Sequence, residues 1–254
     1  MPNVIQFTKL GNFGRFGNQM FQYAFARAYA EKYNARLEIP NWIGEKIFKN
    51  VSHPKPSKKL ARTKLDVVPW GQTNIDLFGY FQSHEVFNIL SESKLREWFM
   101  FKDEWQKYLS PSNKIVAHLR RGDYLSQYSK EFCIISEESY IDAIGSDIEF
   151  LSEESPTIYN DVYVGYSLQK NSMYGRDDCY YDGGISFLPD FFKMINAKTL
   201  LRANSTFSFW AGFFNADKVM SPRVGNLVGL QDVKFEEGNH CSIFPGQCDF
   251  VFRG

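Results

Sequence analysis

The sequence has little that would direct the chain to a charged partner or into a membrane. Its 254 residues contain 29 lysines and arginines and 29 aspartates and glutamates, so the formal net charge is zero. A neutral chain has no overall field that recruits nucleic acid or an anionic membrane. No run of 18 apolar residues occurs, and the first residues lack the basic segment and apolar run of a secretory signal. We therefore expect a cytoplasmic protein with no membrane span and no nucleic-acid partner.

Cysteine is also scarce, with four in the whole chain and no two in the CxxC spacing of a zinc site. Four are too few for a disulfide scaffold, which favours a reducing compartment. Aromatic residues are abundant instead, at 17% with 24 Phe and 14 Tyr. Such side chains fill cores and also form stacking surfaces for sugars and bases. The remaining composition, 44% hydrophobic and 23% charged, is ordinary for one large or two small globular domains.

The first half of the chain predicts a strand, a glycine turn, a helix and a second strand. Residues 4–10 form the first strand, GNFGRFG the turn, residues 20–33 a helix capped by Asn18, and residues 37–39 the second strand. Prolines and lysines then mark loops, and another helix follows Ser83. A Ser-Pro-Ser-Asn segment at residues 110–113 is the expected domain boundary.

The second half continues the alternation of strands and helices. Strands are expected at residues 114–119, 159–166 and 200–203, and helices at residues 137–151, at residues 189–197 and after Asn204. Alternating elements predict parallel sheets, in which ligands bind beyond the carboxyl ends of the strands. We therefore predict an α/β fold of two domains, residues 1–112 and 113–254, with ligand-binding residues in GRFGNQ, HLRRGDY and NSTFSFW.

HLRRGDY, residues 118–124, gives the sharpest chemical signal because a buried strand ends in Arg120 and Arg121. Guanidinium groups present forked donors that match phosphate oxygens, so the pair indicates a diphosphate clamp. The alternative is a surface pair that bridges to acidic neighbours.

Two other segments offer backbone N–H groups to an anion. The loop ending in Gly17 and Asn18 leads into a helix N-terminus, and Ser205 and Thr206 precede an apolar helix. The alternatives are a plain turn and an ordinary helix cap followed by core. Glu38 stands about twenty positions after the loop, where a ribose ligand would be, or is merely a carboxylate at a strand end.

Together these segments resemble the bacterial and viral α-1,2-fucosyltransferases, glycosyltransferase family 11. The resemblance rests on four motifs in family order, GRFGNQMFQYAFARAYAEKYNARL, GYFQSHEVF, HLRRGDY and ANSTFSFW. It implies a GT-B architecture, in which two Rossmann-like domains face across a cleft. It also implies GDP-fucose as donor, an oligosaccharide acceptor, inversion at the anomeric carbon, and no metal or cofactor. The first domain would lie on the acceptor side and the second would bind GDP-fucose.

The resemblance also implies roles for single residues. Arg120 would hold the β-phosphate of the donor with support from Arg121, while His118 and Asp123 would shape the motif or contact the donor. Asn18, with Gly17 before it, would approach the phosphate and the reacting centre, and Ser205 and Thr206 would meet the diphosphate from the other side. We expect Arg120, Asn18 and Asp123 to be catalytic. The general base stays open among Asp123, Glu38 and Asp76.

Two alternatives to this function stay open. GRFGNQ also resembles the protein O-fucosyltransferases, although GYFQS and NSTFSFW favour the first family. A sugar-nucleotide-binding protein without turnover is the other, because residues 162–170 lack the Ser-Asp-Asp segment usual in the family.

Overall fold

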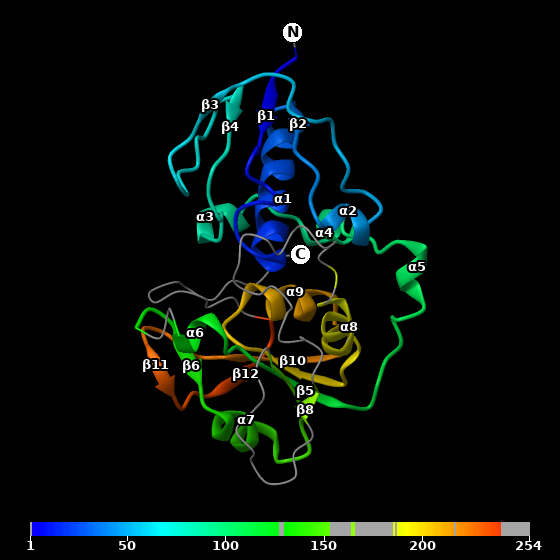
Figure 1. The fold of residues 1–254 in the computed structure, drawn as a ribbon, viewed down its shortest axis with the longest axis vertical. Coiled ribbons are helices and arrows are strands. Elements are labelled where there is room, and N and C mark those ends of the chain that lie inside the picture. The colour runs from blue at the N-terminus through cyan, green and yellow to red at the C-terminus, as the bar shows by residue number, and fades with distance from the viewer. Residues whose placement is uncertain are drawn as a thin grey trace. The chain divides into compact units, whose positions relative to one another are not determined.

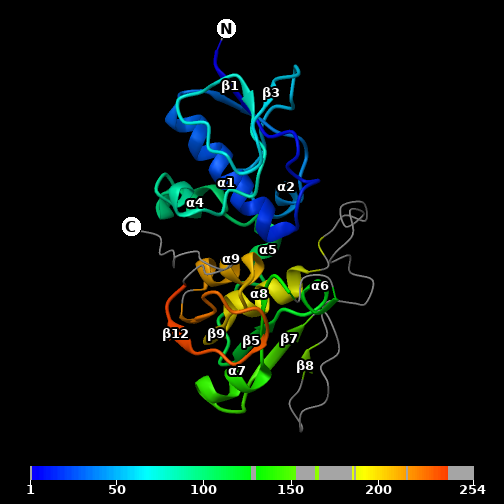
Figure 2. The same ribbon diagram turned by 90° about the vertical axis from the view of Figure 1, so that its left-hand side faces the viewer.

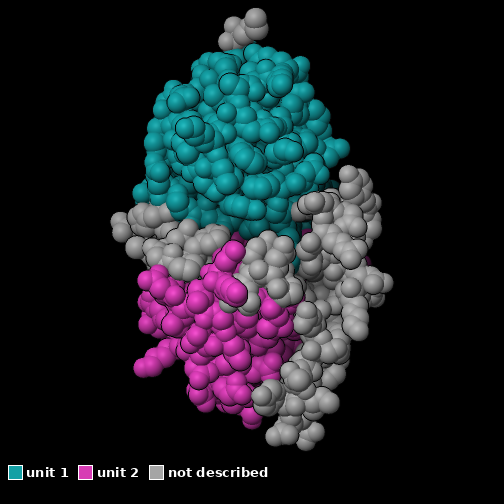
Figure 3. All heavy atoms as spheres, turned by 60° about the vertical axis from the view of Figure 1, so that its left-hand side comes forward, with its two compact units in different colours: residues 1–106, 252–254 teal, residues 107–251 magenta. Residues whose placement is uncertain are grey.

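The computed structural model describes residues 2–126, 130–152, 164–165, 185, 187–215 and 217–239. The described residues form two compact units, an N-terminal unit up to residue 106 and a C-terminal unit from residue 107 onward (Figure 3). The division predicted between residues 112 and 113 lies a few residues further along. Each unit is described by itself, and the cleft that the resemblance implies between them stays a prediction.

The N-terminal unit contains a four-stranded parallel sheet (Figure 1). Its strands are β1 (Val4–Gln6), β2 (Arg36–Glu38), β3 (Ala61–Arg62) and β4 (Ile75–Asp76), in the order β2-β1-β4-β3. Its helices are α1 (Phe16–Lys32), α2 (Gly44–Ile47), α3 (His84–Phe87), α4 (Glu92–Trp98) and α5 (Asp103–Gln106). Only α1 is long, and it packs against β1 and β2.

Helix α1 is buried on nearly all sides of its first four turns, and its buried residues include the polar side chains of Gln19 and Gln22. It ends where Asn34 takes the left-handed backbone conformation, with φ at +47°, that Asn tolerates better than most residues. The prediction that Asn18 caps this helix is wrong, because the backbone turns helical at Phe16 and Arg15 is the capping residue. Across the described ranges, no helix is both long and apolar enough to cross a membrane.

The C-terminal unit is built on a six-stranded sheet of order β12-β10-β9-β5-β7-β8. These strands are β5 (Ile115–Leu119), β7 (Glu149–Ser152), β8 (Val164–Gly165), β9 (Thr199–Leu201), β10 (Lys218–Pro222) and the antiparallel edge strand β12 (Phe235–Glu237). A small second sheet pairs β6 (Cys133–Ile135) with β11 (Gly229–Gln231). The helices are α6 (Asp123–Ser126), α7 (Glu137–Ile144), α8 (Leu188–Asn196) and α9 (Thr206–Phe214). Helices α8 and α9 pack together on one face of the large sheet, and α7 lies on the other (Figures 1 and 2).

One predicted helix is half wrong. Residues 137–151 were expected to be helical throughout, but α7 ends at Ile144 and β7 begins at Glu149. Gly145 stops the helix with φ at +95°, and the apolar residues beyond it pair as a buried strand beside β5. Of the strand predicted at residues 159–166, only Val164 and Gly165 lie among the described residues, and they form β8.

Each sheet has one topological switch point, the place from which successive strands are added first on one side and then on the other. In the N-terminal unit the chain moves from β1 to β2 on one side and later to β3 and β4 on the other. In the C-terminal unit β7 and β8 lie on one side of β5, and β9 and β10 lie on the other. Open α/β sheets bind ligands beyond the carboxyl ends of the two strands that flank such a point. The pairs β1 and β4, and β5 and β9, therefore mark where to look for sites.

Candidate functional site

The C-terminal unit brings HLRRGDY and NSTFSFW together at its switch point. Strands β5 and β9 are parallel neighbours, with Ala117 opposite Leu201. Arg120 directly follows β5, and Asn204 and Ser205 come shortly after β9. We call the group formed by Arg120, Arg121, Tyr124, Asn204 and Ser205 the arginine site.

Arg120 is held against an aromatic ring. Its side chain is buried, and its guanidinium carbon lies 4.8 Å from the centre of the Tyr124 ring. The Tyr124 hydroxyl donates a hydrogen bond to the Asn204 carbonyl over 3.2 Å. Tyr124 therefore ties the segment after β5 to the segment after β9. The sequence placed Tyr124 inside the motif but gave it no role.

Arg121 is also buried, so the pair does not lie at the surface, although the acidic neighbour that the alternative reading expected is present. Its Nη1 donates to the Arg120 carbonyl over 3.3 Å, and its Nη2 lies 3.6 Å from a carboxylate oxygen of Glu137. Burial raises the pKa of Glu137 and the Arg121 charge opposes that rise. Glu137 was missed in the sequence, although Ser136 followed by two glutamates is a helix-start signal that places an acid there.

The N-terminus of α9 completes the arginine site. Ser205 is its capping residue, and the Ser205 hydroxyl accepts a hydrogen bond from the Phe207 N–H over 3.3 Å. Thr206 was expected to precede the helix but is its first residue, so Ser205 alone occupies the capping position. Asn204 fixes the approach to the helix, because its side-chain amide donates to the Cys133 carbonyl over 2.9 Å. The ordinary cap is therefore present, and it directs the positive end of the α9 dipole to the same sheet edge as the arginines.

His118 lies in β5 with its ring buried and edge-on to the Phe207 ring, at 5.7 Å between centres. Burial, and then the charges of Arg120, Arg202 and Arg121, lower the pKa of His118 to about 3. The ring is therefore neutral at physiological pH and carries no charge toward a phosphate. Its contact with Phe207 makes it a packing group behind the arginine site.

Asp123 begins α6, directly after the arginines and Gly122. Its side chain lies outside the described residues, so its predicted catalytic role stays a prediction.

Gly17 and Asn18 belong to the N-terminal unit, and the structure does not place them relative to the arginine site. Gly17 is buried in the first turn of α1, and the Asn18 side-chain oxygen accepts a hydrogen bond from Gln82 over 2.9 Å. Gln82 belongs to GYFQSHEVF, so two motifs that are far apart in sequence meet here. Gln19 and Gln22 donate to the carbonyls of Gly14 and Phe13, which fixes the glycine-rich loop on α1.

The carboxylates of Glu38 and Asp76 are buried and fully engaged. Burial would raise the pKa of Glu38, but hydrogen bonds from Gln6, Ser57 and Arg36 outweigh it and lower the pKa to about 2. Asp76 accepts from the backbone and hydroxyl of Thr8 at 2.8 and 2.7 Å and from Arg62 at 2.9 Å. All of these hydrogen-bond donors belong to the strands and loops of the N-terminal unit. We therefore interpret both carboxylates as groups that hold loops to the sheet rather than as bases or ribose ligands.

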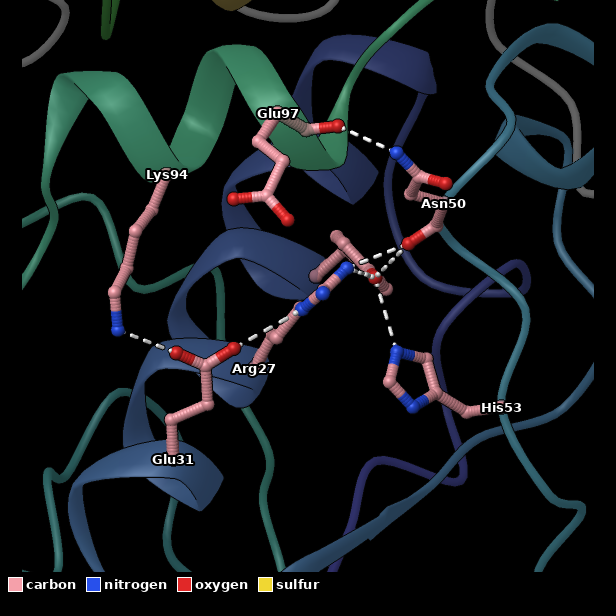
Figure 4. A network of polar contacts seen from close by, with 7 residues as sticks. Arg27, Glu31, Asn50, His53, Lys94 and Glu97 are labelled. Atoms are coloured by element: carbon pink, nitrogen blue, oxygen red, sulfur yellow. Dashed lines mark hydrogen bonds and ion pairs between the residues drawn. The ribbon is translucent and has the colours of Figure 1, made fainter.

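A further polar network fastens α1 to its surroundings (Figure 4). The Tyr23 hydroxyl lies 3.0 Å from His53 Nε2 and accepts from Arg27 over 2.9 Å, and Arg27 also donates to the Asn50 carbonyl. Burial raises the pKa of Tyr23 to about 12, and burial together with the Arg27 charge lowers the pKa of His53 to about 4. At neutral pH both groups are uncharged, and the network joins α1 to the loop after α2 and to α4, with the participants Tyr23, Arg27, Glu31, Asn50, His53, Lys94 and Glu97.

Comparison with known proteins agrees with this arrangement. The family model described as glycosyl transferase family 11 matches residues 59–227, which is more than half of the chain. Among characterised proteins, the alpha-1,2-colitosyltransferase of Escherichia coli is 25% identical over 246 residues, covering 79% of this chain and 84% of that protein.

Solved structures with a similar fold include NodZ alpha-1,6-fucosyltransferase soaked with GDP-fucose, with a TM-score of 0.54 and 13% identity. The match covers 94% of this chain and 100% of that one. Fucosyltransferase NodZ from Bradyrhizobium also aligns with a TM-score of 0.54, at 11% identity, over 94% of this chain and 99% of that one. The fold of this chain, with its parallel Rossmann-like sheets, is thus the GT-B type of these fucosyltransferases.

Proposed function

The chain belongs to glycosyl transferase family 11 and is a glycosyltransferase, and from this premise we propose that it transfers L-fucose from GDP-fucose to a glycan hydroxyl. The linkage we propose is α-1,2 to galactose, formed with inversion at the anomeric carbon. One observation carries the proposal: two buried arginines and a helix N-terminus converge at the switch point of the C-terminal sheet. This group is suited to the diphosphate of a nucleotide sugar.

The arginine site would act on the leaving group. When the bond between fucose and phosphate breaks, positive charge develops on the sugar and negative charge on GDP. Arg120 and Arg121 are already held by Tyr124, Glu137 and the backbone, so they need little reorganisation as that charge appears. Low exposure to water strengthens their interaction with the phosphates.

We further propose that the reaction needs no metal ion, since two guanidinium groups and the α9 dipole supply positive charge at one sheet edge. Transfer that continues unchanged after prolonged dialysis against EDTA supports this. Activity that disappears with EDTA and returns with magnesium or manganese contradicts it.

The acceptor hydroxyl would attack from the face opposite GDP and lose its proton to a carboxylate or late in the reaction. Glu38 and Asp76 are engaged in contacts within their sheet, and Asp123 belongs to the HLRRGDY motif that carries the resemblance, so we assign this role to Asp123. Asp123→Asn should then lower kcat with little change in GDP affinity.

Two donors are worth comparing. The Escherichia coli relative is a colitosyltransferase, so a nucleotide-linked colitose is the second candidate. Colitose is fucose without its 3-hydroxyl, and a site that bonds that hydroxyl discriminates strongly against its loss. Competition between the two GDP-sugars in one assay, read as the ratio of kcat/KM values, decides which is the donor.

The central test is Arg120→Ala in a transfer assay with radiolabelled GDP-fucose. Loss of one such donor typically costs about 3–4 kcal/mol of barrier, a fall of roughly two to three orders of magnitude. Arg223→Ala is the matched control, because Arg223 is a partly exposed arginine of the same unit paired with Glu236. Activity of Arg120→Ala near that of the control would refute the assignment.

Calorimetric titration with GDP-fucose, followed by addition of acceptors, separates the remaining alternatives. Binding without product, for every glycan tried, identifies a sugar-nucleotide-binding protein. Product formed only on a folded, disulfide-rich protein domain identifies a protein O-fucosyltransferase. Product on a β-galactoside supports the function proposed here.

A further inference from the structure

Three aromatic rings gather beside the glycine-rich loop of the N-terminal unit. The rings of Phe13 and Tyr80 are stacked with 4.5 Å between centres, and Phe13 also lies 5.0 Å from Phe78. All three side chains are half-buried, although the same unit buries most of its other Phe side chains completely. We call Phe13, Phe78 and Tyr80 the aromatic platform.

The aromatic platform lies at the switch point of its sheet. Phe78 comes two residues after β4, and Phe13 lies in the loop that leads from β1 to α1. Strands β1 and β4 are the parallel neighbours between which the chain changes direction, so their carboxyl ends are where a ligand of this sheet should bind. The arginine site occupies the equivalent place in the other sheet.

A polar rim borders the rings. The Arg62 guanidinium lies 5.5 Å from the centre of the Phe78 ring, and its side chain is 42% exposed. Arg62 Nε donates to Asp76 and Nη2 to Thr8, both over 2.9 Å, which leaves Nη1 without a hydrogen-bond partner among the described residues. A fixed donor is therefore available at the edge of an aromatic surface.

The loop that carries Phe13 is held in place from two sides. A Cβ on Gly14 would lie 2.8 Å from the Asn18 side chain and 2.9 Å from the Tyr80 ring, so the loop, Asn18 and Tyr80 are in direct contact. Asp66 accepts the backbone N–H groups of Tyr80 and Phe81, at 2.5 and 2.9 Å. The rings are thus preorganised next to Asn18, the residue of this unit that the resemblance links to the reacting centre.

We propose that the aromatic platform binds a sugar ring of the acceptor glycan, with Arg62 donating to one of its hydroxyls. Apolar C–H faces of a pyranose pack on aromatic rings, and its hydroxyls take hydrogen bonds at the rim. Phe13, Phe78 and Tyr80 supply the face, and Arg62 the donor. The proposal rests on the proposed function, because it names the subsite of the acceptor in the same reaction.

Glycan binding is tested first without turnover, by saturation-transfer NMR on the full chain with GDP present. The probes are methyl β-galactoside, methyl β-glucoside and methyl β-N-acetylglucosaminide. We expect saturation to be strongest at the C–H protons on one face of a bound glycoside and to be lost in Tyr80→Leu, which keeps apolar volume without a ring. Tyr80→Phe should retain binding. No binding of any probe to the wild-type chain would overturn the proposal.

The matched control is Trp70→Leu, because Trp70 is another partly exposed aromatic residue of the same unit but lies over Tyr29 and Lys32 of α1. In the transfer assay we expect Tyr80→Leu to raise the acceptor KM about tenfold, with the GDP-fucose KM unchanged. Trp70→Leu should change neither. Equal acceptor KM values in the two variants would exclude the aromatic platform as the subsite.

Arg62→Gln gives an independent result if Tyr80→Leu melts early, since Arg62 is exposed on the edge strand β3. Arg62→Gln should raise the acceptor KM severalfold, and an unchanged KM would contradict the role of Arg62 as a donor to the sugar.

The proposed function and the aromatic platform can fail independently of each other. Ring-dependent glycoside binding without GDP-fucose turnover refutes the proposed function alone, whereas normal turnover with indifferent Tyr80 and Arg62 variants refutes the aromatic platform alone.

Discussion

Asp190, in the first turn of α8, is a carboxyl group that the fold buries at a cost. Its side chain is 1% exposed, and neither carboxylate oxygen has a hydrogen-bond partner within the part of the chain that the structure describes. Burial raises its pKa to about 7, and the nearby Lys193 charge only partly opposes this. The folded pKa lies above the unfolded value, so ionisation disfavours the folded state as pH rises from about 4 to 7, and the cost is complete above pH 7.

We predict that Asp190→Asn stabilises the protein at pH 8, by about 2–4 kcal/mol of unfolding free energy. The gain should shrink toward zero near pH 3, where most of the carboxyl is protonated in both states. Urea unfolding at the two pH values measures it. Asp142→Asn is the control, because Asp142 is an exposed carboxylate on α7 of the same unit. A destabilised Asp190→Asn at pH 8 would mean that the ionised group has a stabilising role.

How much of the site could be predicted depended on whether local sequence encodes the contact. Arg120 and Ser205 were found because each follows a recognisable strand, and a parallel sheet brings such positions together. The pairs Tyr124–Asn204, Arg121–Glu137 and Asn18–Gln82 join residues 16 or more positions apart, and nothing in one sequence reports those pairings. For Glu38 and Asp76 the sequence left the role open, since a carboxylate at a strand end has the same appearance whether it binds a ligand or holds a loop.

At the scale of elements, the glycine-rich turn before α1 is built on a backbone that side chains disfavour. Gly14 has φ at +77°, and a Cβ there would crowd Asn18 and Tyr80 below 3 Å. Gly71 has nearly the same backbone, with φ at +79°, but a Cβ would meet nothing within 4 Å. Comparing substitutions at Gly14 and Gly71 therefore separates the cost of the backbone conformation from the cost of steric clashes.

We predict that Gly14→Ala and Gly71→Ala each lose roughly 1–2 kcal/mol of stability from the left-handed backbone. Gly14→Ala should lose more, because Asn18 or Tyr80 must move, and it should also lose transfer activity. Gly71→Ala should keep full activity. Thermal melts and the transfer assay measure both effects, and equal activity of the two variants would show that the close contacts of Gly14 do not matter to function.

The N-termini of α7 and α9 provide a second pair of elements. Ser136 caps α7 by accepting from the Ser139 N–H over 3.2 Å and also bonds Asp232, while Ser205 caps α9. Only the α9 cap belongs to the arginine site.

We predict that Ser205→Ala and Ser136→Ala each cost about 1 kcal/mol, with Ser136→Ala the larger because the Ser136 hydroxyl also bonds the buried Ser139 hydroxyl. Only Ser205→Ala should weaken GDP binding in calorimetry, by severalfold, since the proposed function places the diphosphate at that helix. Equal GDP affinities in the two variants would remove Ser205 from the donor site.

For the whole molecule, the alternation of strands and helices was enough to predict an α/β fold, because period and turn chemistry encode it locally. The short strands β3, β4 and β10 to β12 were not predicted, since two to five residues carry no clear period and their pairing comes from the assembled sheet. The helix expected over residues 137–151 failed for a related reason. Apolar residues after Gly145 fit either a helix or a buried strand, and only the neighbouring β5 decides between them.

Stability of the whole protein against pH combines groups that act in opposite directions. His53 and His118 have folded pKa values of about 4 and about 3, below that of an unfolded histidine, so they contribute stability fully above pH 6.5 and lose it as pH falls through 6.5 to 4 and below. Asp190 gains stability over almost the same range as it takes up a proton. Between pH 6 and 4.5 these three groups together take up about one net proton on unfolding, the difference between two histidines and one carboxyl.

Asp190→Asn removes the opposing group, so the fall in unfolding free energy should steepen by up to about 1.4 kcal/mol per pH unit. Adding His53→Gln to that background should make the fall shallower by a similar amount, because one histidine fewer takes up a proton on unfolding. Chemical unfolding at half-unit steps from pH 6 to 4.5 measures the three slopes. If the Asp190→Asn curve runs parallel to that of the wild type, Asp190 is ionised throughout and its burial is compensated. If His53→Gln leaves the slope unchanged, the Tyr23 and Arg27 network does not keep His53 neutral.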